Sequence, residues 1–132
     1  MRGRAGALRW GLVALYAGAI FVGSSIGVRD DRKFEIPCDK LWHVAELAVL
    51  GALAARASSG GGKVRWRHAG LAAAIGALYG SFDEIHQSFV PGRTASLADA
   101  LADTAGTIAG IAAWSLFAAR SGGAADEERK SQ

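Results

Sequence analysis

The sequence predicts an all-α fold, in which four transmembrane helices form an antiparallel bundle with both chain termini in the cytoplasm. Three observations lead to this prediction. Hydrophobic residues make up 51% of the 132 residues, although aromatic residues are only 8%. The chain contains 18 Gly residues, and small residues let helices approach closely in lipid. The apolar residues also fall into four segments, which predicts one membrane domain over residues 1–120 and a polar, disordered tail over residues 121–132.

The four apolar segments differ in how well each fits a membrane span, which needs about 20 mainly apolar residues. The first (8–28) and the last (97–119) are long enough. The second (41–57) is shorter, and the third (68–87) reaches this length only with a polar cluster at its end. A soluble bundle would also be rich in Ala, but the first and last segments are apolar around the whole helix, which favours a membrane location. The first segment is also longer than the apolar core of a signal peptide, so we expect an uncleaved span.

The distribution of basic residues predicts the orientation. Ten of the 15 Lys and Arg residues lie at the N-terminus (up to Arg9), in and beside the loop between the second and third segments (from Arg56 to Arg67), and after the fourth segment. The positive-inside rule places these regions in the cytoplasm. The net charge of +3 thus follows from topology, and the expected partners are membrane lipids rather than nucleic acid. The single cysteine, Cys38, cannot form an internal disulfide, and the sequence leaves open whether the chain forms oligomers.

The end of the third segment is the most unusual stretch of the chain, because polar residues follow a run of small apolar ones. Asp83, His86 and Gln87 share one helix face, since residues three and four apart are neighbours. Glu84 points about a quarter turn away. The Pro-Gly pair that follows ends the helix and places Arg93 in a tight loop above this face.

Two further groups of polar residues begin the second and fourth segments, again at helical spacing. They are Asp39, His43 and Glu46 in the second segment, and Ser96, Asp99 and Asp103 in the fourth. Asp39 is expected to cap its helix. In an antiparallel bundle the starts of the second and fourth spans meet the end of the third, so the sequence predicts one polar pocket at the extracytoplasmic face.

These residues form motifs that resemble a known family. The motifs are Asp39-Lys40-x-x-His43, Asp83-Glu84-x-His86-Gln87, Pro91-Gly92-Arg93, and Asp99 followed by Gly106. Over residues 28–119 the chain is similar to the VanZ-like family of small bacterial integral membrane proteins. The resemblance implies that the family's signature positions correspond to Lys40, His43, Asp83, Glu84, Gln87, Arg93 and Asp99. Where this chain has Glu46, related sequences often carry Tyr.

The resemblance also implies a location and a biological context. It implies a multi-pass protein of the bacterial cytoplasmic (inner) membrane. The founding member of the family is associated with resistance to the glycopeptide teicoplanin, which implies a link to the cell envelope and to antibiotic resistance.

The first functional hypothesis is a site that binds or modifies an anionic envelope molecule, such as a lipid-linked phosphate or a peptidoglycan precursor. Lys40, Arg93 and Ser96 would bind the ligand, because Arg and Lys hold anions as a planar fork and as a point charge. The candidate catalytic or orienting residues are His43, Asp83, Glu84, His86, Gln87 and Asp99.

Three other hypotheses remain open. The pairs His43 with Glu46 and Asp83 with His86 could bind a transition metal, since each places an imidazole and a carboxylate one helical turn apart. Intramembrane acids and histidines could instead relay protons during transport. Alternatively, the polar residues form an ion-pair network that only holds helix ends together. The sequence does not decide whether the protein is an enzyme, and it names no cofactor.

Overall fold

The chain folds into four α-helices. The computed structural model describes the backbone of residues 2–26, 36–93 and 96–130, and side chains within 3–26, 40–93 and 96–122. The helices are α1 (Arg2–Ser24), α2 (Ile36–Ser58), α3 (Trp66–Gln87) and α4 (Leu97–Lys130). No strand occurs among the described residues, so the all-α prediction is confirmed.

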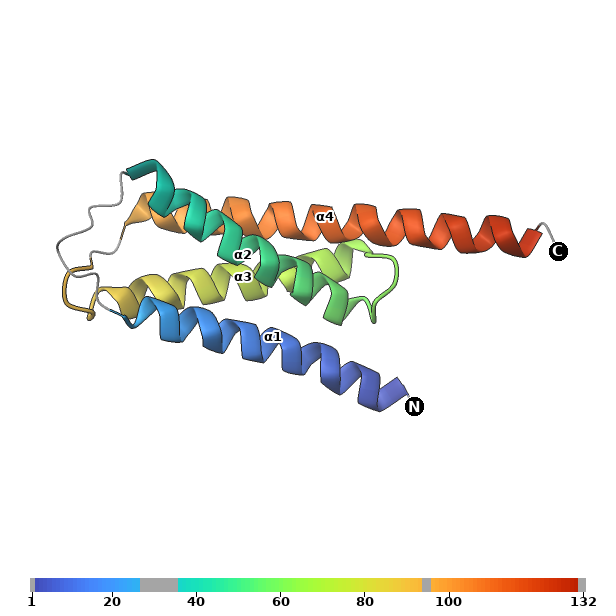
Figure 1. Cartoon of the computed structure of the whole chain (residues 1–132), viewed down its shortest axis with the longest axis horizontal. Coiled ribbons are helices and arrows are strands. Elements are labelled where there is room, and N and C mark those ends of the chain that lie inside the picture. The colour runs from blue at the N-terminus through green and yellow to red at the C-terminus, as the bar shows by residue number, and fades with distance from the viewer. Residues whose placement is uncertain (1, 27–35, 94–95, 131–132) are drawn as a thin grey trace.

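Consecutive helices run in opposite directions (Figure 1). The ends of α1 and α3 and the starts of α2 and α4 lie at one end of the bundle, which we call the α3–α4 end. The N-terminus and the α2–α3 loop lie at the opposite end, where α4 extends beyond the other helices. The three polar segments of the sequence are therefore carried to the same end of the molecule.

Glycines set the close approach of α2 and α4, the pair of helices with the most extensive contact. A Cβ atom at Gly106 would collide with the backbone of Val44, and one at Gly110 would collide with the backbone of Ala48. Without side chains at these two positions, the backbones of the helices can touch. This close contact between α2 and α4 determines how the polar N-terminal turns of the two helices face each other.

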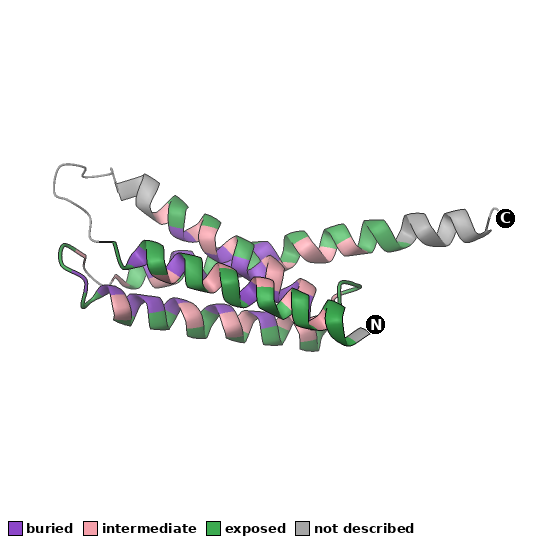
Figure 2. Ribbon diagram, turned by 60° about the horizontal axis from the view of Figure 1, so that its bottom comes forward, coloured by how far each residue is buried: buried purple, intermediate pink, exposed green. Residues whose placement is uncertain are grey.

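The buried residues line the inward faces of the helices (Figure 2). Many large apolar side chains are exposed on the outside of the bundle, while the buried residues are mostly small or polar. Leu47 and Leu50 are the only large side chains that are fully buried in the described part of the chain. By contrast, Leu78 is 73% exposed and Phe89 is 80% exposed. A water-soluble bundle would bury such side chains, because burial of a Leu or Phe contributes about 1.5–3 kcal/mol.

Two helical stretches, Gly3–Ser24 and Leu97–Gly122, are long and apolar enough to cross a membrane, judged by length and composition. They lie in α1 and α4 and correspond to the first and last apolar segments of the sequence. Within the described residues, α2 and α3 contain no stretch that passes this test.

Two helix boundaries differ from those predicted. The second helix begins at Ile36 rather than near residue 41 and includes Pro37, which is compatible with a first turn because the N–H that Pro lacks has no partner there. The last helix continues to Lys130, where a disordered tail was predicted from Ser121. Ala, Glu, Arg and Lys in this stretch favour helix. The predicted cap Asp39 and the cysteine Cys38 lie outside the residues whose side chains are described.

Candidate functional site

Polar side chains from all four helices are buried together toward the α3–α4 end. The buried polar and charged residues of the described chain are Ser24, His43, Asp83, Glu84, Gln87, Asp99, Asp103 and Thr107. Burial of such groups is costly unless they are paired or bind a ligand. Seven of the eight fall into two groups, which we call the inner cluster and the Asp83 network; Thr107 donates to the backbone oxygen of Asp103 on its own helix.

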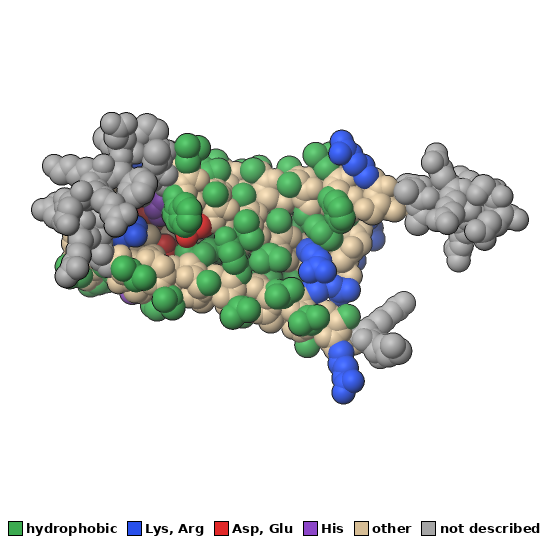
Figure 3. Space-filling view, in the orientation of Figure 1, with side chains coloured by type: hydrophobic (Ala, Val, Ile, Leu, Met, Phe, Trp, Pro, Cys, Tyr) green, Lys and Arg blue, Asp and Glu red, His purple; other side chains and the backbone are tan. Residues whose placement is uncertain are grey.

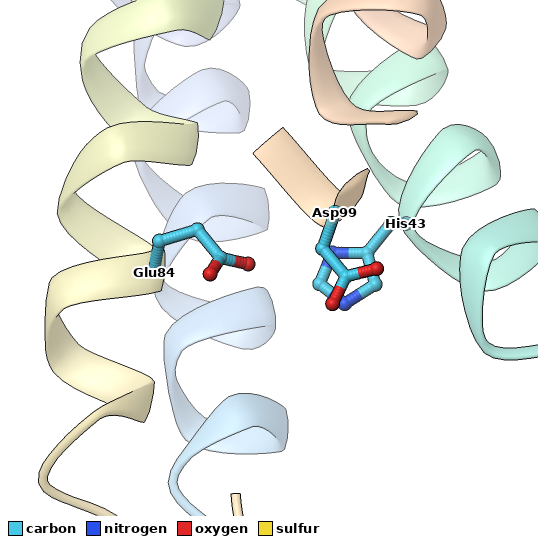
Figure 4. Close-up of side chains that lie close together, drawn as sticks. All are labelled: His43, Glu84 and Asp99. Atoms are coloured by element: carbon cyan, nitrogen blue, oxygen red, sulfur yellow. The ribbon is translucent and has the colours of Figure 1, made fainter. Parts of the chain in front are cut away.

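The inner cluster joins α2, α3 and α4 through His43, Glu84, Asp99, Asp103 and Lys40. His43 Nδ1 lies 3.0 Å from Asp103 Oδ1, and both side chains are at most 5% exposed. Lys40 Nζ donates to Asp99 Oδ1 over 2.7 Å at the rim of the cluster. The potential ligand atoms of His43, Glu84 and Asp99 all lie within 4.8 Å of one another. In Figure 4 the Glu84 carboxylate extends from α3 toward the Asp99 carboxylate and the His43 ring.

Glu84 is held by the start of α4. Its Oε2 accepts a hydrogen bond of 2.7 Å from the backbone N–H of Ser96, the residue before α4. A carboxylate is favourable at this position because the helix N-terminus carries a partial positive charge. The other oxygen, Oε1, is buried and has no hydrogen-bond partner among the described residues. Ser96, a predicted substrate-binding residue, contributes its main-chain N–H to the site.

Gly80 makes room for the innermost acid of the cluster. A Cβ atom at this position of α3 would lie 2.9 Å from Asp103 Oδ2 and 3.1 Å from Asp103 Cβ. Any other residue would therefore displace the Asp103 carboxylate and, with it, the hydrogen bond to His43. Asp103 Oδ2 is also buried without a partner in the described part of the chain.

The Asp83 network lies on the α1 side of α3. Asp83 Oδ1 accepts a hydrogen bond of 2.6 Å from Ser24 Oγ, and Oδ2 accepts one of 2.6 Å from Gln87 Nε2. The hydroxyl of Tyr79, one turn earlier, donates to the backbone oxygen of Ala17 over 2.6 Å. These bonds join α1 to α3, and both Asp83 oxygens are satisfied by neutral donors.

Arg93 stands at the edge of both groups and is only partly buried. A terminal guanidinium nitrogen of Arg93 lies 3.5 Å from Gln87 Oε1, its hydrogen-bond partner among the described residues. Its Nε is buried without a hydrogen-bond partner, and no described acid lies within ion-pair distance. The ion-pair network predicted from the sequence is therefore formed by Lys40 with Asp99, but not by Arg93.

His86 faces α1, away from the inner cluster. Its Nε2 lies 2.9 Å from Ser25 Oγ, and its ring centroid lies 4.3 Å from that of Phe21. The two side chains of the predicted metal pair Asp83 and His86 have separate partners, because the Asp83 carboxylate accepts hydrogen bonds from Ser24 and Gln87.

Only one of the predicted metal candidates belongs to the group of residues that could hold an ion. This candidate is His43; its companions are Glu84 and Asp99, not Glu46, Asp83 or His86. Glu46 is half-buried on α2.

The sequence places Asp103 in the polar pocket through its spacing of four residues from Asp99, but assigns it no catalytic, binding or metal role. Ser24 was not predicted as a member of the site. Ser24 had no such signal, because a serine at the end of an apolar segment is ordinary.

The bundle is all-α, with a polar interior, an apolar exterior and two helices able to cross a membrane. These features are those of an α-helical membrane protein with a buried polar site. A model of the VanZ/LLP1 family matches residues 11–118, and the chain belongs to this family. The predicted resemblance is thus confirmed, and the match reaches into all four helices. Comparisons with curated proteins and with solved structures found no match.

Proposed function

We propose that this VanZ-like protein crosses the bacterial cytoplasmic membrane four times and binds an anionic cell-envelope molecule at its extracytoplasmic face. In this proposal Arg93 and Lys40 hold the anionic group, and the buried acids and His43 lie beneath it. The observation that carries the proposal is the partly buried guanidinium of Arg93, which has no acid within ion-pair distance in the described chain.

The lengths and surfaces of the middle helices support four spans. The helices α2 and α3 have 23 and 22 residues, which at about 1.5 Å per residue is long enough for a hydrocarbon core of about 30 Å. Both present large apolar side chains outward, such as Trp42 on α2 and Phe82 on α3. Their polar residues face the bundle interior, as expected for ionisable residues within a membrane.

The positions of the basic side chains support the orientation. In Figure 3 several Lys and Arg side chains lie at the end of the bundle that carries the N-terminus and the α2–α3 loop, and an apolar surface separates them from a smaller basic area at the α3–α4 end. With the positive-inside rule, this distribution favours a cytoplasmic location for the basic end. The inner cluster and Arg93 would then face the extracytoplasmic side.

The chemistry of the two cations supports an anionic ligand. A guanidinium offers five N–H donors in a planar fork that suits phosphate or carboxylate, and those of Arg93 make one long hydrogen bond in the described structure. The Lys40 side chain is 37% exposed and pairs with Asp99. A ligand phosphate at this rim would therefore contact Arg93 first and Lys40 at its edge.

The proposal is tested by binding to purified protein in lipid nanodiscs, with a polyprenyl phosphate and the corresponding uncharged polyprenol as probes. We expect a preference for the phosphate, and a loss of at least about tenfold in its affinity in Arg93→Gln, because charge-assisted hydrogen bonds contribute about 1.5–3 kcal/mol. Arg4→Gln, at an exposed position of the opposite end, is the matched control and should bind normally. Equal binding of phosphate and polyprenol, or unchanged binding by Arg93→Gln, would refute the proposal.

The proposal extends to the glycopeptide resistance that the family resemblance implies. If resistance depends on this ligand, expression of the wild-type chain in a susceptible bacterium should raise the inhibitory concentration of teicoplanin, and Arg93→Gln should abolish the increase. If the wild-type chain does not raise the inhibitory concentration, this protein does not confer teicoplanin resistance.

A further inference from the structure

We propose that the inner cluster is a binding site for a divalent transition-metal ion, with His43, Glu84 and Asp99 as ligands. Asp103 acts as a positioning residue that holds the imidazole. This ligand set differs from the pairs that the sequence predicts, and it brings together α2, α3 and α4. The inference depends on the geometry of the inner cluster and not on the anionic ligand proposed above.

The distances within the cluster are close to those of a metal site. The candidate ligand atoms of His43, Glu84 and Asp99 are within 4.8 Å of one another. Two atoms that bind one ion at about 2.0–2.2 Å are at most about 4.4 Å apart. A small rotation of the Glu84 or Asp99 side chain would therefore complete the coordination without movement of a helix.

The contact between His43 and Asp103 supplies the arrangement that metal-binding histidines usually have. With Nδ1 donating to Asp103 Oδ1 over 3.0 Å, the lone pair of the imidazole is on Nε2. Histidine ligands commonly donate their other N–H to a carboxylate in this way, which fixes the tautomer and the orientation of the ring. Gly80 preserves this contact by leaving room for the Asp103 carboxylate.

Glu84 provides a second, independent indication of a ligand. Its side chain is 8% exposed, and its Oε1 is buried without a hydrogen-bond partner among the described residues. Figure 4 shows this carboxylate directed at Asp99 and His43 rather than at solvent. An unpartnered carboxylate oxygen is costly in such a place, and coordination to a cation would remove the cost.

The charges of the cluster also favour a divalent cation. Three carboxylates, those of Glu84, Asp99 and Asp103, are gathered around one ammonium group, that of Lys40. When all four are ionised and His43 is neutral, the group has a net charge of two negative units, before the guanidinium of Arg93 at its edge is counted. Buried charges of one sign are strongly unfavourable unless they are paired, and one divalent ion would balance them.

The donor set indicates the kind of metal. One imidazole and two carboxylates suit Zn²⁺, Mn²⁺ or Fe²⁺, whereas Mg²⁺ and Ca²⁺ prefer oxygen ligands alone. Three protein ligands would leave a coordination position for water or for an oxygen of a bound ligand.

The test measures how much metal the full chain binds. The protein is purified in detergent, stripped of metal with a chelator and then titrated with Zn²⁺. We expect about one ion per chain for the wild type, with affinity reduced at least about tenfold in His43→Gln and in Glu84→Gln. His86→Gln is the matched control, because it removes a histidine at the same end that faces Ser25. It should retain the wild-type affinity. Circular dichroism and thermal unfolding verify that each variant is folded.

A positioning role for Asp103 predicts a different result from the loss of a metal ligand. Asp103→Asn should still bind metal, but with an affinity lower by about ten- to a hundredfold, and the visible absorption of the Co²⁺-substituted protein should shift because the basicity of His43 changes. Less than a tenth of an ion per folded wild-type chain, on the order of background, would overturn the proposal. So would an equal loss of affinity in His86→Gln. Binding of polyprenyl phosphate is measured separately, so either proposal can fail while the other stands.

Discussion

Asp83 and Glu84 are adjacent in the sequence and both are buried, yet they lie in different environments. Both oxygens of Asp83 accept short hydrogen bonds, from Ser24 and from Gln87. Glu84 accepts one bond from the main chain of Ser96, and its other oxygen has no partner in the described structure. Since satisfied polar groups stabilise and unsatisfied ones destabilise, Asp83 belongs to the scaffold, whereas Glu84 is available for a ligand.

The largest difference should appear when each acid is removed by the same substitution. Asp83→Ala leaves the buried Gln87 amide without its acceptor and leaves Ser24 Oγ with only the backbone oxygen of Phe21, and we expect the free energy of unfolding to fall by about 2–4 kcal/mol. Glu84→Ala removes the acceptor of the Ser96 N–H but also a buried carboxylate oxygen without a partner, so its cost should be smaller, about 1 kcal/mol. Unfolding in mixed detergent micelles measures both values. An equal loss of stability in the two variants would contradict the division into scaffold and ligand site.

A smaller effect is expected from the two neighbouring serines at the end of α1. Ser24 Oγ is buried and donates to Asp83, whereas Ser25 is exposed and lies beside His86. Ser24→Ala should lower the free energy of unfolding by about 1 kcal/mol, as for other side-chain hydrogen bonds within membrane proteins. Ser25→Ala, measured in the same micelles, is the control and should change it by less than about 0.5 kcal/mol. A greater cost for Ser25→Ala would mean that the contact with His86, not that with Asp83, holds α1 in place.

Much of the fold and the location of the site could be predicted from the sequence. Four apolar segments gave four helices, and helical spacing with antiparallel order brought the polar starts of α2 and α4 to the end of α3. These features are local or follow from the order of the segments in the chain, and so they can be predicted from a single sequence.

The pairing of individual side chains could not be predicted, because it depends on the rotation and crossing of whole helices. The backbone contacts at Gly106 and Gly110 set how α4 meets α2. The rotation of α3 decides which of two adjacent acids faces α1 and which faces α4. For this reason the metal candidates Asp83 and His86 were assigned to the wrong neighbours, and Ser24 was missed.

The location of the site relative to the membrane can be tested most directly by cysteine accessibility in intact cells. In a Cys38→Ser background, Pro91→Cys would place a thiol in the exposed connection between α3 and α4, and Lys63→Cys would place one in the exposed α2–α3 loop. We expect a membrane-impermeant maleimide to label the first variant in intact cells and the second only after the cells are permeabilised. Labelling of Lys63→Cys but not Pro91→Cys in intact cells would contradict an extracytoplasmic site.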